Sequence, residues 1–258
     1  GYWGGADAGW YDARSGAVTD KICADNLFSI DKQTGGTKWT YSRGIVINST
    51  VTVHDNRVYF VESRNRDVID APERRVGNPK LWEDQFLVAL DAYNGDVLWE
   101  RPIDTEDGKV VFFLAGGASG RLVIVASADQ NYHVYGFSTD GGEQQWHQTF
   151  RWPGGKGDHG KAMSRPAIVG DRVYVKPQGF QLADGKPLPG QMPIGKCGTY
   201  ACSENAIFYR ASTVTMWNQE TGKSSGWNRL RNDCWLSTIP AAGMLLAAEG
   251  GGGCSCGT

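Results

Sequence analysis

Short runs of alternating apolar and polar residues recur along the chain, and each run ends at a glycine-containing turn. Three copies are closely alike: residues 27–39 (LFSIDKQTGGTKW), 87–99 (LVALDAYNGDVLW) and 134–146 (VYGFSTDGGEQQW). In each copy a glycine stands four residues before a tryptophan. Alternation indicates a half-buried strand, and glycine in a turn supplies the positive φ angle that tight hairpins need. The copies therefore predict three β-hairpins.

Two further copies are degenerate. Residues 180–190 (FQLADGKPLPG) keep the turn glycine but lack the tryptophan. Residues 214–227 (VTMWNQETGKSSGW) have one extra residue between Gly222 and Trp227. The same hairpin pattern thus occurs five times along the chain, and weakens toward the C-terminus.

A second element separates the hairpins, and it consists of a strand, a tight turn and a nearly continuous apolar strand. Its copies are residues 47–63, 112–127, 164–176, 197–210 and 235–249. The second strand lacks clean alternation in Val58–Val61 and Leu122–Ala126, so we expect both faces of those strands to be buried.

The two elements together give four strands per repeat, which predicts an all-β fold, a β-propeller of four-stranded antiparallel blades. The chain begins with one hairpin and ends with one strand pair, with four full sets between them. We expect about five blades, either as a complete ring or as part of a larger one. Residues 1–26 form an N-terminal loop segment, and residues 27–258 form the blades. A two-sheet sandwich is the structural alternative, but it does not explain the repeated glycine–tryptophan spacing.

Composition agrees with this fold and excludes two classes of protein. The 258 residues include 35 glycines and 10 tryptophans, which suit short strands and tight turns better than helices. A net charge of −2 argues against a dedicated nucleic-acid-binding protein. No apolar run is long enough for a transmembrane helix.

The segment LVALDAYNGDVLW, taken with a strand pair of the NSTVTVHDNRVYFVES type, resembles the PQQ-like β-propeller repeat family. That family includes quinoprotein dehydrogenases, the propeller lipoprotein of the outer-membrane β-barrel assembly machinery and uncharacterised multi-repeat bacterial members. The resemblance implies that Trp39, Trp99 and Trp146 pack between adjacent blades. Members usually have more blades, which implies that further blades or a protein partner complete the ring.

The resemblance implies a binding or scaffold module that is periplasmic or extracellular. A small molecule or a polysaccharide is an alternative ligand to a protein. Two enzymatic alternatives stay open, a PQQ-dependent dehydrogenase that holds its quinone with calcium, and a carbohydrate-active lyase or hydrolase. The dehydrogenases often clamp the quinone with adjacent cysteines, and this sequence has no such pair.

Long connections all fall on one face of the predicted propeller, where binding residues concentrate. The loop 151–165 brings Asp158, His159 and Lys161 together, which suits general acid–base catalysis. Lys156 and Arg165 in the same loop would bind an anionic ligand. A solvated polar loop without a ligand is the alternative interpretation.

Aromatic residues supply further candidate ligand-binding positions. Trp82 lies in a charged insertion (residues 64–85), where it would clamp a ligand or partner. Trp10 and Tyr11 in the N-terminal segment would line a carbohydrate site or plug the propeller.

Four cysteines are the last group of candidate site residues. Cys197, Cys234, Cys254 and Cys256 are expected on the same face, either as disulfides or as a thiolate metal site. Cys202 is expected to lie about 16 Å from Cys197 along an extended strand, too far for a disulfide.

Overall fold

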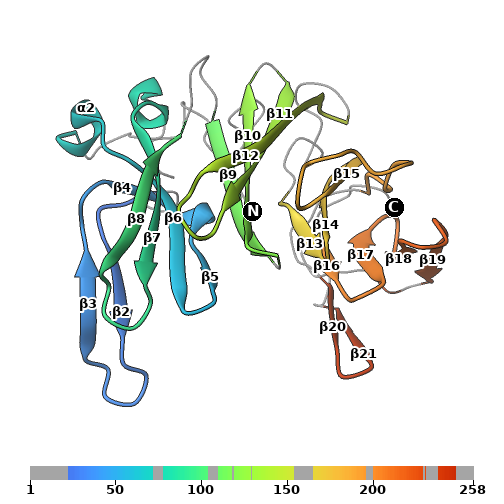
Figure 1. The fold of residues 1–258 in the computed structure, drawn as a ribbon. Coiled ribbons are helices and arrows are strands. Elements are labelled where there is room, and N and C mark those ends of the chain that lie inside the picture. Colours follow the sequence, from blue (N-terminus) through green and yellow to red (C-terminus); the bar gives the residue numbers. More distant parts are fainter. Residues whose placement is uncertain are drawn as a thin grey trace.

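The chain folds almost entirely into short antiparallel strands, as the alternating patterns predict (Figure 1). The computed structural model describes residues 23–71, 78–103, 110–117, 119–128, 130–153, 165–195, 200–228, 230 and 238–247. Helices within these ranges are short: η3 (Asn48–Thr50), α2 (Arg66–Ile69) and η5 (Pro79–Trp82). No helix in the described part is long and apolar enough to cross a membrane.

The strands follow the order of the predicted repeats. They are β1 (Cys23–Ala24), β2 (Leu27–Ile30), β3 (Thr37–Tyr41), β4 (Ile45–Ile47), β5 (Thr52–His54), β6 (Arg57–Ser63), β7 (Gln85–Asp91), β8 (Val97–Pro102), β9 (Val110–Gly117), β10 (Arg121–Ala128), β11 (Asn131–Ser138), β12 (Gln144–Arg151), β13 (Ala167–Val169), β14 (Arg172–Val175), β15 (Gln178–Gln181), β16 (Ala201–Cys202), β17 (Ala206–Arg210), β18 (Val214–Asn218), β19 (Ser224–Trp227), β20 (Thr238–Ala241) and β21 (Met244–Ala247).

Four larger sheets succeed one another along the chain, with a two-stranded hairpin between β1 and β4 of the first sheet and another after the last sheet. The sheets have the orders β1-β4-β6-β7-β8 (with β5 also paired to β6), β12-β11-β10-β9, β13-β14-β15 and β16-β17-β18-β19. The hairpins are β2–β3 and β20–β21. Successive sheets lie side by side in Figure 1, which is the arrangement of propeller blades. The number of blades in a closed ring stays a prediction.

The third sheet has three strands because prolines occupy the segment where its fourth strand is expected. Pro187 and Pro189 carry no backbone N–H and cannot donate to a ladder. Only an isolated bridge joins Phe180 to Pro187.

Apolar clusters fill each junction between consecutive sheets, so the core is divided among the junctions. Tyr59 and Leu87 of the first sheet pack with Leu122 and Tyr135 of the second. Corresponding clusters join hairpin β2–β3 to the first sheet, the second sheet to the third, and the third to the fourth. The predicted burial of both strand faces is confirmed, since Val58–Val61 and Leu122–Ala126 are buried throughout.

The described parts of the charged insertion, residues 64–71 and 78–85, contain two short capped helices. Asn65 caps α2 by accepting a hydrogen bond from the Asp67 backbone N–H, and Asn78 caps η5 in the same way through Lys80. Val68, Leu81 and Trp82 are buried beneath these two helices. Trp82 is 6% exposed, and its role in clamping a ligand or partner stays a prediction.

Candidate functional site

A tryptophan from each of three hairpins lies on the turn of the hairpin that follows it. Trp39 in β3, Trp99 in β8 and Trp146 in β12 each donate an indole N–H hydrogen bond to a carbonyl of the next turn. The acceptors are the carbonyls of Ala92, Thr139 and Leu182, at 3.1, 3.0 and 3.0 Å. Each acceptor stands three residues before the turn glycine of its hairpin. We call this combination of turn carbonyl and turn glycine an indole notch.

The glycine of each notch is needed for two reasons. Gly142 has a φ of +73°, and a Cβ built on it would lie 2.5 Å from the Trp99 ring. A Cβ on Gly185 would lie 2.7 Å from the Trp146 ring. A side chain there would both strain the backbone and displace the indole. The glycine–tryptophan spacing of the sequence is therefore one half of a contact between neighbouring sheets.

The series is interrupted between the third and fourth sheets. The position four residues after Gly185 holds Pro189 instead of tryptophan. A Cβ on Gly222, the turn glycine of the next hairpin, would meet no atom of the described residues within 4 Å. A groove of about 470 Å³ opens here, lined among others by Pro189, Trp217, Gln219 and Gly222. We call it the Pro189 groove.

The Pro189 groove combines aromatic surface with polar groups. The rings of Tyr174 and Trp217 meet edge to face with centroids 5.7 Å apart. The Tyr174 hydroxyl donates to Gln219 Oε1 at 2.9 Å, while Gln219 Nε2 is buried with no hydrogen-bond partner among the described residues. Arg172 lies at the same groove. Burial raises the pKa of the Tyr174 hydroxyl, and Arg172 partly offsets this effect.

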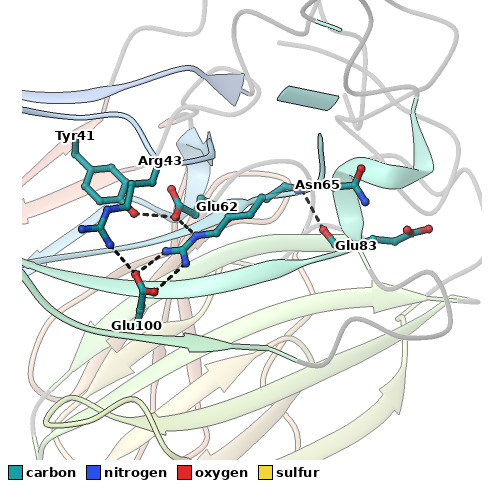
Figure 2. A network of polar contacts seen from close by, with 8 residues as sticks. Tyr41, Arg43, Glu62, Asn65, Glu83 and Glu100 are labelled. Atoms are coloured by element: carbon teal, nitrogen blue, oxygen red, sulfur yellow. Dashed lines mark hydrogen bonds and ion pairs between the residues drawn. The ribbon is translucent and has the colours of Figure 1, made fainter. Parts of the chain in front are cut away.

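A second polar cluster lies on the first sheet and binds hairpin β2–β3 to it (Figure 2). The Tyr41 hydroxyl donates to Glu62 Oε1 at 2.8 Å, and Arg64 Nε donates to the same oxygen at 2.7 Å. Arg64 also donates to both oxygens of Glu100, at 2.9 and 2.7 Å. Arg43 reaches Glu100 at 3.2 Å from the solvent side. Elements β3, β6 and β8 are thereby tied together.

Arg64 neutralises a fully buried carboxylate. The Glu62 side chain is 0% exposed, and its Oε2 has no hydrogen-bond partner among the described residues. The Arg64 guanidinium also lies 4.1 Å from the centre of the Phe86 ring. Burial, reinforced by Glu62, raises the pKa of the Tyr41 hydroxyl, so this hydroxyl stays a hydrogen-bond donor. These contacts give the cluster a structural role.

Acid should weaken this cluster through Glu100. Its hydrogen bonds to Arg64 hold the pKa of the Glu100 carboxyl below the usual 4.5. A carboxyl with a lowered pKa in the folded chain adds stability above its unfolded pKa, and that stability is lost as pH falls through the folded pKa. We expect the free energy of unfolding, measured with urea, to fall as pH drops below 4.5, and Glu100→Gln to reduce that fall. An identical acid dependence in both proteins would contradict this role.

Most of the residues that the sequence singles out lie outside the described residues. They are Trp10, Tyr11, Lys156, Asp158, His159, Lys161, Cys197, Cys234, Cys254 and Cys256. Their predicted roles in catalysis, ligand binding, disulfides or a thiolate site stay predictions. Arg165 is described and lies two residues before β13. Cys202 carries a free thiol in β16, and burial raises its pKa to about 11.

Calcium beside a quinone needs a set of oxygen donors. Within the described ranges, no three His, Cys, Asp or Glu side chains converge. A quinone site with calcium stays a prediction.

Sequence reasoning missed both the Pro189 groove and the role of Glu62. The groove does have a signal, because the hairpin 180–190 is the copy that lacks tryptophan. Glu62 is a charged residue inside the apolar run of β6, and its counterion Arg64 stands two residues further along, while Tyr41 stands 21 residues away. The signal for a buried ion pair is therefore a glutamate in an apolar strand with an arginine close behind it.

A family model described as outer membrane protein assembly factor BamB matches residues 17–227. No curated protein sequence matches the chain.

Solved structures share the fold at low sequence identity. BamB from Moraxella catarrhalis is 12% identical with a TM-score of 0.53, over 78% of this chain and 60% of that one. The Pan2 WD40 domain of Neurospora crassa is 8% identical with a TM-score of 0.55, over 85% and 64%. The rhamnogalacturonan lyase YesX is 11% identical with a TM-score of 0.51, over 83% and 44%. These likenesses support the β-propeller fold, and the chain spans less than two thirds of each of these structures.

Proposed function

Because the chain belongs to the family described as outer membrane protein assembly factor BamB, we propose that it is an extracytoplasmic binding module. In this proposal the Pro189 groove receives an aromatic side chain of a partner protein. The proposal rests on one observation: no atom of the described residues lies within 4 Å of a Cβ built on Gly222, so this indole notch holds no indole among them. The family description supports a place outside the cytoplasm and a protein partner.

Tryptophan is the occupant that the notch chemistry favours. Three notches of this chain each hold an indole that covers the turn glycine and donates its N–H to the carbonyl three residues earlier. In the vacant notch, Gln219 stands three residues before Gly222 and so has the place of the acceptor. A partner's indole would bury its apolar surface on Gly222 and keep its N–H bonded.

The polar groups that line the Pro189 groove favour a peptide ligand over an isolated aromatic ring. The buried Gln219 Nε2 needs an acceptor, and a peptide carbonyl beside the indole supplies one. Arg172 would add a guanidinium that pairs with a carboxylate or stacks on the indole. The proposed partner segment is therefore an extended peptide with a tryptophan and an acidic neighbour.

Titration of the chain with N-acetyl-tryptophanamide, followed by NMR, tests this proposal. We expect saturable shifts of the Trp217, Gln219 and Gly222 signals, and much weaker shifts with N-acetyl-alaninamide. Pro189→Trp places the chain's own indole in the groove and should abolish the shifts. Absence of shifts at these residues in the unsubstituted chain, or their persistence in Pro189→Trp, would overturn the proposal.

A further inference from the structure

Two histidines meet on one face of the second sheet, away from the Pro189 groove. In the register of β11 and β12, His133 stands opposite Thr149 and Tyr135 stands opposite His147. Residues two apart on a strand share a face, so these four side chains all project from the same side of the sheet. The contacts among His133, His147 and Thr149 lie at the exposed surface.

Three donor atoms converge in this group. His133 Nδ1 lies 3.3 Å from His147 Nε2. Thr149 Oγ1 lies 3.4 Å from His133 Nδ1 and 3.2 Å from His147 Nε2. The three atoms thus form a nearly equilateral triangle with two nitrogen corners and one oxygen corner.

This triangle has the size of one face of a zinc coordination tetrahedron. Zinc–nitrogen bonds of about 2.0–2.1 Å at tetrahedral angles place ligand atoms about 3.3–3.4 Å apart. Square-planar copper with bonds of similar length would bring neighbouring ligands to about 2.9 Å. We propose that His133 Nδ1, His147 Nε2 and Thr149 Oγ1 bind one Zn²⁺ ion.

Ring stacking orders the two histidine side chains before the metal binds. The Tyr135 ring stacks on the His147 ring with centroids 4.2 Å apart and planes 6° from parallel. The rings of His133 and His147 are also stacked, at 5.5 Å and 20°. Stacking fixes the direction of the ring nitrogens, so little ordering remains to be done when zinc binds.

Calorimetric titration of the full chain with ZnCl₂ tests the site. We expect His133→Ala and His147→Ala each to lose one equivalent of bound zinc relative to the unsubstituted chain. Thr149→Val keeps both imidazoles and the side-chain shape. It should weaken the affinity for that zinc ion about tenfold, because one ligand atom is lost. His54→Ala removes a histidine of β5, outside the proposed site, and should leave the binding of that zinc equivalent unchanged.

Melting temperatures without zinc, measured for all four variants, show whether each one is folded. Zinc should raise the melting temperature of the unsubstituted chain and of His54→Ala, and raise it less in Thr149→Val, since the metal binds the folded state. Equal zinc binding by the unsubstituted chain, His133→Ala, His147→Ala and Thr149→Val would overturn the proposal. The histidines would then form a hydrogen-bonded pair only.

Discussion

Replacement of Trp146 by alanine is expected to lower the free energy of unfolding by about 3–5 kcal/mol, the usual cost of truncating a large buried aromatic side chain. The Trp146 ring is 7% exposed and packs with Val173 and Phe180 of the third sheet. Its N–H donates to the Leu182 carbonyl at 3.0 Å. The alanine variant loses this contact between the second and third sheets and leaves a cavity there. Urea unfolding followed by circular dichroism measures the loss.

Trp227→Ala is the matched control for that experiment. The Trp227 ring is 40% exposed and stacks on Phe208 within its own sheet, with centroids 6.2 Å apart. It fills no notch, so we expect a loss of about 1 kcal/mol or less, as for other exposed positions. Equal losses in the two variants would mean that indole notches do not hold the sheets together.

Replacement of Arg64 by alanine is expected to lower the free energy of unfolding by about 3–5 kcal/mol, because it leaves a buried carboxylate without its counterion. Glu62 is fully buried and relies on Arg64 for its charge partner at 2.7 Å. The same substitution breaks both hydrogen bonds to Glu100 and the contact with the Phe86 ring. The free energy of unfolding of the variant, measured in urea at neutral pH, checks the expected value.

Arg43→Ala is the control at the edge of the same cluster. Its side chain is 58% exposed, pairs with Glu100 at 3.2 Å and lies 5.9 Å from the centre of the Tyr41 ring. Exposed ion pairs contribute about 0–1 kcal/mol, so we expect a loss within that range. If Arg64→Ala lowers the free energy of unfolding no more than Arg43→Ala does, the buried ion pair between Arg64 and Glu62 does not stabilise the fold.

The hairpins and the all-β fold could be predicted because their signals are local. A turn glycine with positive φ stands in each of the five predicted hairpins, four of which form paired strands. Each prediction needed only residues within about a dozen positions of one another. Repetition then specified the propeller, since a single hairpin cannot bury its apolar face alone.

The groove and the ion cluster could not be predicted because they depend on contacts between repeats. A missing tryptophan at Pro189 opens space against Gly222, a residue of the next sheet. The cluster joins Glu62 to Tyr41 of β3, and joins Arg64, which follows β6, to Glu100 of β8; only the folded chain brings these three strands together. Unlike the repeated glycine–tryptophan contacts, the ion cluster occurs once and leaves no periodic trace in the sequence.

The stability of Pro189→Trp, compared with Pro189→Ala, tests most directly whether the groove is a vacant indole notch. Both variants remove the proline, so the difference between them isolates the indole. We expect Pro189→Trp to be more stable than Pro189→Ala by about 1–3 kcal/mol, the gain from burying an aromatic side chain. A Pro189→Trp variant that is no more stable than Pro189→Ala would contradict the account.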